Sequence, residues 1–331
     1  MASTVKEIAK KANVSIATVS RALNGDEKVK KDTKELVLLV AKELNYNPNI
    51  IARNFVKKSS NIVGLILPNI TDEFFSEIIR GVDQITYSRG YYTSVPSSHE
   101  NRSIEETIAA VLGSGLVGGV VVLVPALDKE IRNSLNIRKI PKVFIGGDNG
   151  NKNFDSIVID NYQGAFLMAE YLMKKRNYNK LAFITGPSKN QDATMRQNGF
   201  LDALKKNEVG IKNSWVVRGD FTKESGRSAC EKLLKLKERP QVIFASNDMM
   251  AIGCYEVIKE AGLTIPNDIG VAGFDDIIIS QYLSPPLTTV KVQIMEIGKQ
   301  AANLLMNRME GDDSKTIHIK ISTELVIRNS C

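Results

Sequence analysis

From Asn61 onward, short runs of apolar and often β-branched residues recur along the chain, and segments of helical length separate them. The runs span residues 62–67, 91–95, 120–124, 143–145 and 157–159, and a second series spans 181–184, 215–217, 242–245 and 269–273. Continuous apolar strands that alternate with helices are typical of parallel sheets covered by helices on both faces. The two series therefore predict an α/β body made of two doubly wound lobes.

The first 60 residues follow a different pattern, that of three short amphipathic helices. The capping-box pattern Thr4-x-x-Glu7 precedes the first helix, and Asp32-x-x-Glu35 precedes the third. Ser15 can cap the second helix, which Asn24-Gly25 can end. Two short helices joined by a tight turn and supported by a third form a helix-turn-helix.

The charge distribution favours a nucleic-acid partner for this module. Residues 1–60 hold 12 Lys and Arg against 6 Asp and Glu, so they carry +6 of the net charge of +7. A basic helix-turn-helix on an almost neutral body is typical of a DNA-binding protein. Three ordinary capped helices with a solvated basic face are the alternative.

The second helix would present its exposed face to the major groove, because Val19 and Leu23 point inward. The forked guanidinium of Arg21 can donate two hydrogen bonds to guanine. Apolar side chains on this face can contact thymine methyls, and hydroxyls can bind phosphates. The residues that we assign to these contacts are Ile16, Ala17, Thr18 and Ser20.

In the body, the residues that follow the strands are candidates for a binding site, because doubly wound folds bind ligands at the carboxyl ends of their strands. These positions are rich in hydrogen-bonding side chains, with rings and an arginine nearby: Asn69, Asp72, Asp160, Asn161, Asn247, Asp248, Asp275 and Asp276, with Phe74, Phe75, Phe221 and Arg196. Such a set suits a polyhydroxylated ligand such as a sugar. Taken singly, each Asp or Asn is more often a helix cap.

The stretch from Val5 to Asn24, VKEIAKKANVSIATVSRALN, is similar to the headpiece signature of the lac repressor (LacI/GalR) family of bacterial transcription regulators. The stretch from Tyr46 to Arg53, YNPNIIAR, resembles the hinge of that family. The resemblance implies sequence-specific binding of double-stranded operator DNA. It adds DNA contacts outside the exposed face of the second helix: Thr4, Ser15, Asn24, Asn49, Ala52 and Arg53.

The resemblance also implies that the hinge becomes a helix on DNA and inserts an apolar side chain into the minor groove. The family usually has Leu at the wedge position, whereas this sequence has Phe55. An aromatic ring can stack on the bases that it separates, so we assign Phe55 to the wedge.

Several body motifs look like the periplasmic-binding-protein-like effector domain of the same family: Asp160-Asn161, Gly186-Pro187, 192–196, Asn247-Asp248, 273–276 and 287–290. The likeness implies that eight residues face a cleft between the lobes: Phe74, Phe75, Asn190, Asp192, Arg196, Phe221, Asn247 and Asp275. We add Asn69 and Asp72 from the strand-end pattern. The purine-binding branch has Arg at position 190 and Thr at 192, so the sequence favours a neutral sugar over a purine.

These observations predict a headpiece over 1–47, a hinge helix or linker over 48–60 and an effector-binding and dimerisation domain over 61–331. The N lobe would comprise about 61–160 and 292–322, and the C lobe about 161–291 and 323–331. One headpiece reads one half-site, so a palindromic operator predicts a homodimer. A final strand is expected over 317–327.

Enzyme chemistry finds little support in the sequence. The chain has two His and three Cys, and we assign it no catalytic residue, metal or cofactor. The motif Gly113-x-Gly115-x-x-Gly118 precedes a strand and follows a helix, the reverse of a dinucleotide-binding turn. Two alternatives to a small-molecule-gated repressor stay open: a regulator gated by a protein corepressor, and a sugar-acting enzyme fused to a DNA-binding head.

The N-terminus lacks the apolar stretch of an export signal, and the longest apolar runs are too short for a membrane span. The sequence thus predicts a cytoplasmic protein without a membrane partner.

Overall fold

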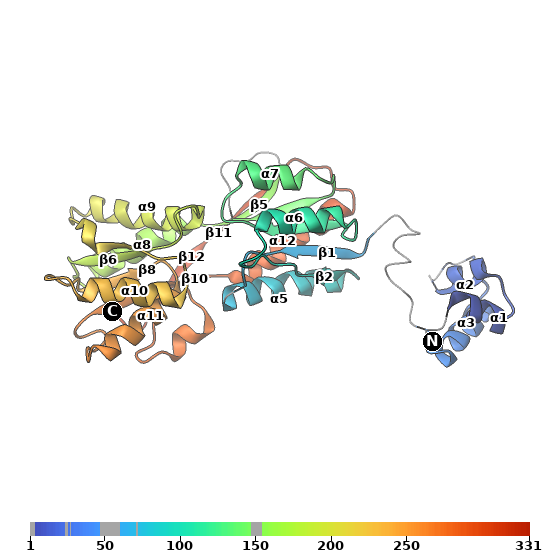
Figure 1. Ribbon diagram of the computed structural model, residues 1–331, viewed down its shortest axis with the longest axis horizontal. Coiled ribbons are helices and arrows are strands. Elements are labelled where there is room, and N and C mark those ends of the chain that lie inside the picture. Colours follow the sequence, from blue (N-terminus) through green and yellow to red (C-terminus); the bar gives the residue numbers. More distant parts are fainter. Residues whose placement is uncertain (1–3, 24–25, 27, 47–59, 71, 147–153) are drawn as a thin grey trace. The chain divides into compact units, whose positions relative to one another are not determined.

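The computed structural model describes residues 4–23, 26, 28–46, 60–70, 72–146 and 154–331. Contacts within the chain divide it into one unit of residues 1–60 and a second unit of residues 61–331. Figure 1 traces both units from the N-terminus to the C-terminus. The predicted hinge residues 48–59 lie outside the described residues.

The first unit contains three helices, α1 (Val5–Lys11), α2 (Ile16–Leu23) and α3 (Lys31–Glu43). The Thr4 capping box is formed, since its side chain accepts from the Glu7 N–H and Glu7 accepts from the Thr4 N–H. The predicted box at Asp32 is wrong. Helix α3 already begins at Lys31, so Asp32 lies in its first turn, where a negative charge favours the helix dipole.

The N lobe of the second unit is a six-stranded sheet in the order β11-β5-β4-β3-β1-β2, and all neighbouring strands are parallel. Its strands are β1 (Ile62–Ile66), β2 (Tyr92–Ser94), β3 (Gly119–Leu123), β4 (Lys142–Ile145), β5 (Asp155–Ile159) and β11 (His318–Ile321). Its helices are α5 (Glu73–Ser88), α6 (Ile104–Gly113), α7 (Lys129–Leu135) and α12 (Ile294–Met309).

The C lobe repeats this plan with the strand order β12-β10-β9-β8-β6-β7. Its strands are β6 (Leu181–Thr185), β7 (Val216–Arg218), β8 (Val242–Ala245), β9 (Gly270–Asp275), β10 (Thr288–Val292) and β12 (Thr323–Val326). Its helices are α8 (Asn161–Lys174), α9 (Gln191–Lys206), α10 (Lys223–Leu234) and α11 (Asp248–Glu260), with two short 3-10 helices, η1 (Asn213–Trp215) and η2 (Ile278–Tyr282).

Alternating strand residues bury both faces of each sheet. In the N lobe, Leu65 and Val121 pack on the side of α5 and α12, whereas Ile66 and Val120 pack on the side of α6 and α7. In the C lobe, α8 and α9 cover one face, and α10 and α11 cover the other. The predicted α/β body of two doubly wound lobes is confirmed, and Figure 1 shows these layers.

Three segments connect the lobes: β5 to α8 around Asp160, β10 to α12 around Gln293, and β11 to β12 around Ser322. The last of these corrects the single strand predicted over 317–327. The segment divides into β11, which is parallel to β5, and β12, which is antiparallel to β10. Because the chain crosses between the lobes at these three segments, each lobe is built from separate parts of the sequence.

Candidate functional site

In the first unit, α2 has one buried and one exposed face. Ser15 caps the helix, since its hydroxyl accepts from the Thr18 N–H at 3.0 Å. Val19 and Ala22 are fully buried against α1 and α3. The exposed positions are those expected to contact DNA: Ile16, Ala17, Ser20 and Arg21.

Arg21 is exposed, and no carboxylate within 4–23, 26 and 28–46 forms an ion pair with it. Thr18 is half-buried, and its hydroxyl lies 2.8 Å from that of Ser15. Thr4 caps α1. Five further predicted contacts, Asn24, Asn49, Ala52, Arg53 and Phe55, lie outside the described residues.

In the second unit, the polar residues at the strand ends are helix caps as well as cleft candidates. Asp72 caps α5, Asp160 caps α8, Asn190 caps α9 and Asn247 caps α11. Each cap follows a parallel strand, so the first turns of these helices gather at the carboxyl ends of the two sheets. A capping role and a position in the cleft are therefore compatible for the same residue.

Arg196 is the centre of a buried polar cluster in the C lobe. Its Nε donates to Asn161 Oδ1 at 2.7 Å, its Nη1 donates to the Ser246 carbonyl at 2.5 Å, and its Nη2 lies 3.1 Å from Asp275 Oδ1. The guanidinium also stacks 3.8 Å from the centre of the Phe274 ring. The side chain is 4% exposed. These contacts hold the charged group in one orientation.

Asp275 provides the carboxylate of this cluster in an unusual environment. Its φ is +111°, a region that non-glycine residues rarely adopt, and strain of this kind is concentrated at functional sites. Oδ1 is buried and aligned with no hydrogen-bond donor, although it lies at ion-pair distance from Arg196. Burial raises the pKa of Asp275 to about 8, against the opposing effect of Arg196.

Phe221 and Asn247 are linked beside this cluster. The Asn247 side-chain amide donates to the Phe221 carbonyl at 2.9 Å while its oxygen accepts from the Met250 N–H at 3.0 Å. Phe221 has a φ of +73°, and its ring lies 5.7 Å from the Arg196 guanidinium. The cap bond holds Asn247 in place, and Asn247 in turn holds the backbone of Phe221 beside the polar cluster.

The two lobes meet at this cluster. The negative charge of Asp72, in the N lobe, contributes to raising the pKa of Asp275 in the C lobe. The backbone N–H of Gln191 donates to the Pro125 carbonyl at 3.0 Å, and the N–H of Ile278 donates to the Glu73 carboxylate at 2.7 Å. The structure therefore brings the polar ends of the two lobes into contact.

The remaining predicted residues take different positions. Phe74 and Phe75 are half-buried, pack on the body core and form an edge-to-face pair at 5.6 Å. Asn69 is exposed, and no described contact joins its side chain to the cluster. The backbone carbonyl of Ser246 and the ring of Phe274 are parts of the cluster that sequence reasoning missed. A carbonyl has no side-chain signature, and Phe274 lies inside a strand.

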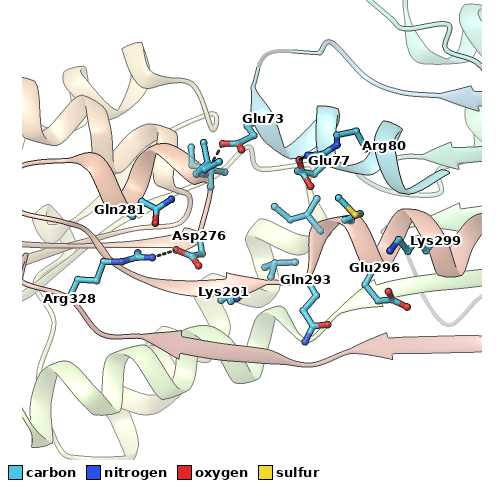
Figure 2. Close-up of a pocket in the computed structure, with 15 residues that line it drawn as sticks. Glu73, Glu77, Arg80, Asp276, Gln281, Lys291, Gln293, Glu296, Lys299 and Arg328 are labelled. Atoms are coloured by element: carbon cyan, nitrogen blue, oxygen red, sulfur yellow. Dashed lines mark hydrogen bonds and ion pairs between the residues drawn. The ribbon is translucent and has the colours of Figure 1, made fainter. Parts of the chain in front are cut away.

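A separate cavity of about 500 Å³ lies beside the segment that joins β10 to α12. Figure 2 shows Glu73, Glu77 and Arg80 of α5 on one side and Asp276, Gln281 and Arg328 on the other. Many of its charges are paired within the chain, such as Arg328 with Asp276 at 2.7 Å. None of the predicted cleft residues lines it, so we place the candidate binding site at the buried Arg196 cluster instead.

A basic helix-turn-helix joined to a two-lobed ligand-binding fold defines a DNA-binding regulator. Known proteins agree with this class. Residues 4–49 match the model of the bacterial regulatory proteins of the lacI family, and residues 169–331 match a periplasmic binding protein-like domain. The chain is 34% identical to the HTH-type transcriptional repressor PurR of Photorhabdus laumondii, over 96% of this chain and 94% of that protein.

Solved structures give the same result. A lac repressor dimer bound to operator and an anti-inducer has a TM-score of 0.88 and 25% identity over 100% of this chain and 99% of that one. A complex of the transcriptional regulator CelR with cellobiose has a TM-score of 0.77 and 27% identity over 99% of this chain and 100% of that one.

The chain therefore belongs to the lacI family of bacterial regulatory proteins. Like its relative, it is a DNA-binding transcriptional repressor and not an enzyme. Within the part of the chain that the structure describes, no helix is both long and apolar enough to span a membrane.

Proposed function

We propose that this repressor binds a palindromic operator as a homodimer in the cytoplasm, and that a carbohydrate bound between its lobes controls the affinity for DNA. The buried Arg196 cluster carries the proposal. It brings a guanidinium, the ring of Phe221 and a carboxyl oxygen that is ion-paired but not hydrogen-bonded together at the junction of the lobes. A sugar offers hydroxyls for the polar groups and a CH face for a ring.

The comparisons support parts of this proposal. The cellobiose complex shows that a transcriptional regulator of the same fold binds a sugar. The lac repressor structure is a dimer on an operator. A two-fold dimer places two copies of α2 one helical repeat apart on DNA, which matches a palindrome.

For the DNA contacts, we propose the exposed α2 residues as readers and the hinge as a minor-groove wedge. Arg21 would read a guanine, with Ile16, Ala17 and Ser20 around it. Phe55 would separate a central base step. The headpiece, hinge and lobe boundaries that we predict from the sequence belong to this proposal.

The experiment begins with selection of random duplex DNA by the full-length chain, which should return a palindrome. Binding to that duplex is then measured with and without a panel of sugars. Arg21→Ala should lower affinity by about 1–3 kcal/mol and relax one position in each half-site. Lys42→Ala, an exposed change on α3, is the matched control and should weaken all sequences about equally.

Two results would contradict the proposal. One is an Arg21→Ala chain that keeps the sequence preference of the parent, which would remove the reader role. The other is an operator complex that no sugar strengthens or weakens, which would favour gating by a protein corepressor.

A further inference from the structure

The candidate cleft contains more carboxyls than cationic groups. Among the cleft residues that we propose, Asp72, Asp192 and Asp275 carry carboxyls, whereas Arg196 is the single cation. The other members are amides and rings. The charge of an effector is therefore the property that this site is best able to discriminate.

The guanidinium of Arg196 is already engaged within the protein. Each of its three nitrogens faces a partner in the C lobe, namely Asn161, the Ser246 carbonyl and Asp275. The counterion Asp275 is 6% exposed. A phosphate or carboxylate on a ligand would have to displace this buried carboxylate, which would leave Asp275 without a counterion.

The carboxyls, in contrast, have free accepting capacity. Asp275 Oδ1 is buried and lies 3.1 Å from Arg196 Nη2, but no donor is aligned with it as in a hydrogen bond. Asp192 has Arg196 as its electrostatic partner, and no described group donates a hydrogen bond to it. A buried acceptor without an aligned donor is rare in folded proteins, so Asp275 Oδ1 marks a place where an external donor would bind. The half-buried Asp192 lies on the same side of α9 as Arg196 and offers a second acceptor.

Asp192 also reaches the opposite lobe. Its Oδ2 would lie 3.4 Å from a Cβ added at Gly146, directly after β4 of the N lobe. Burial raises the pKa of Asp192 and that of Asp72, which means that the site already disfavours negative charge. A negative charge on a ligand between these groups would meet the same cost of burial, and any of the carboxyls that is ionised would repel it.

We infer that this cleft selects effectors that carry hydroxyl or amine donors and no negative charge, and that Asp192 and Asp275 enforce the selection. The unphosphorylated form of a sugar, neutral or amino-substituted, is then the signal, and its phosphate ester is not. The inference rests on the proposed effector function but concerns charge, whereas the proposed function concerns the carbohydrate class.

The test is calorimetric titration of the full-length chain with paired ligands. The panel holds neutral sugars such as ribose, glucose and cellobiose, the amino sugar glucosamine, and the phosphates of the monosaccharides. It also holds nucleosides with their monophosphates. We expect each unphosphorylated ligand that binds to have an affinity at least about 100-fold higher than that of its phosphate ester.

Asp192→Asn keeps the size of the side chain and removes its charge. It should reduce this discrimination about tenfold. Asp202→Asn is the matched control, because Asp202 lies on the same helix, is exposed and accepts a hydrogen bond from Tyr162 outside the cleft. The control should retain the discrimination of the parent chain.

The outcomes separate the two proposals. If a nucleoside binds, its monophosphate does not bind and no sugar binds, the charge selection is supported and the carbohydrate class is overturned. If a sugar phosphate binds as tightly as its parent sugar, the carbohydrate class is supported and the charge selection is overturned. Silence of the entire panel would overturn both, and unchanged discrimination in Asp192→Asn would remove Asp192 from the inference.

Discussion

The two lobes share one topology, yet they contribute to the cleft in different ways. In the C lobe, Arg196, Asn247 and Asp275 are buried and bonded to groups of their own lobe. In the N lobe, Asp72 and Phe74 are half-buried on the first turn of α5, and Asp72 bonds to its own helix. The C lobe therefore holds a preformed half-site, whereas the described contacts of Asp72 hold it within its own helix in the N lobe.

The backbone shows the same difference. In the C lobe, Phe221 and Asp275 have positive φ at the cleft, and so does the next residue along the chain, Asp276. In the described part of the N lobe, the residues with positive φ are glycines, such as Gly146. A strained non-glycine residue persists only where its surroundings hold it in place. The recognition geometry is therefore built into the C lobe.

The largest expected effect comes from removing the centre of that half-site. Arg196→Ala leaves Asp275 buried without a counterion and removes the donors that bind Asn161 and the Ser246 carbonyl. We expect a loss of about 3–5 kcal/mol in the free energy of unfolding, measured by urea denaturation. Arg80→Ala, which removes an exposed arginine paired with Glu77 on α5, should cost less than about 0.5 kcal/mol. Equal losses would contradict a preformed C lobe.

The pH dependence of stability distinguishes the lobes, because each contains a buried carboxyl and the pKa values of these two carboxyls are shifted in opposite directions. In the C lobe, burial raises the pKa of Asp248 to about 7, although Ser280, Thr289 and the Ile277 N–H donate to it. In the N lobe, burial also opposes the charge of Asp155, but Arg308 at 2.7 Å holds the pKa of that carboxyl below its usual range.

The sign follows from proton binding. Between the usual pKa of 3.8 and about 7, folded Asp248 keeps a proton that the unfolded chain releases, so its contribution to stability falls as pH rises. Asp248→Asn should flatten that decline by up to about 1.4 kcal/mol per pH unit. Asp155 acts in the opposite sense, because its contribution is lost as pH falls. Urea denaturation across this range measures the change in the free energy of unfolding per pH unit. The control Asp202→Asn should leave this slope unchanged. If Asp248→Asn also has the slope of the parent chain, the Asp248 carboxyl stays ionised in the folded protein.

Much of the fold follows from local patterns in the sequence. Continuous apolar runs predict that both faces of each sheet are buried, as the structure shows, and the cap-like pair at Asn247 begins α11. Local patterns predict the first residue of a helix less well, as Asp32 shows. A negatively charged side chain is favourable in the first turn of a helix as well as at the cap position, so it does not fix where the helix begins.

The contacts that assemble the site were harder to predict, because they join residues far apart in the chain. Arg196 meets Asn161, the Ser246 carbonyl and Asp275 from four different segments. The division of 317–327 between two sheets depends on the partners β5 and β10, which no local pattern reveals. The sequence therefore indicates which polar residues follow the strands. Only the tertiary structure shows which of them have hydrogen-bond partners within the protein.

The smallest effect comes from comparing one helix cap in each lobe, and it tests the difference most directly. Asp72→Ala removes the cap of α5, where the carboxylate accepts from the Phe74 N–H at 3.1 Å, and should cost about 1 kcal/mol in urea denaturation. Asn247→Ala removes the cap of α11 and also frees the buried Phe221 carbonyl, so the cost should rise to about 2 kcal/mol. Because both changes delete one cap, the excess in Asn247→Ala measures the added bond that fixes Phe221. If the two variants lose the same stability, that bond contributes nothing, and the C lobe is no better preformed at Phe221 than the N lobe is at Phe74.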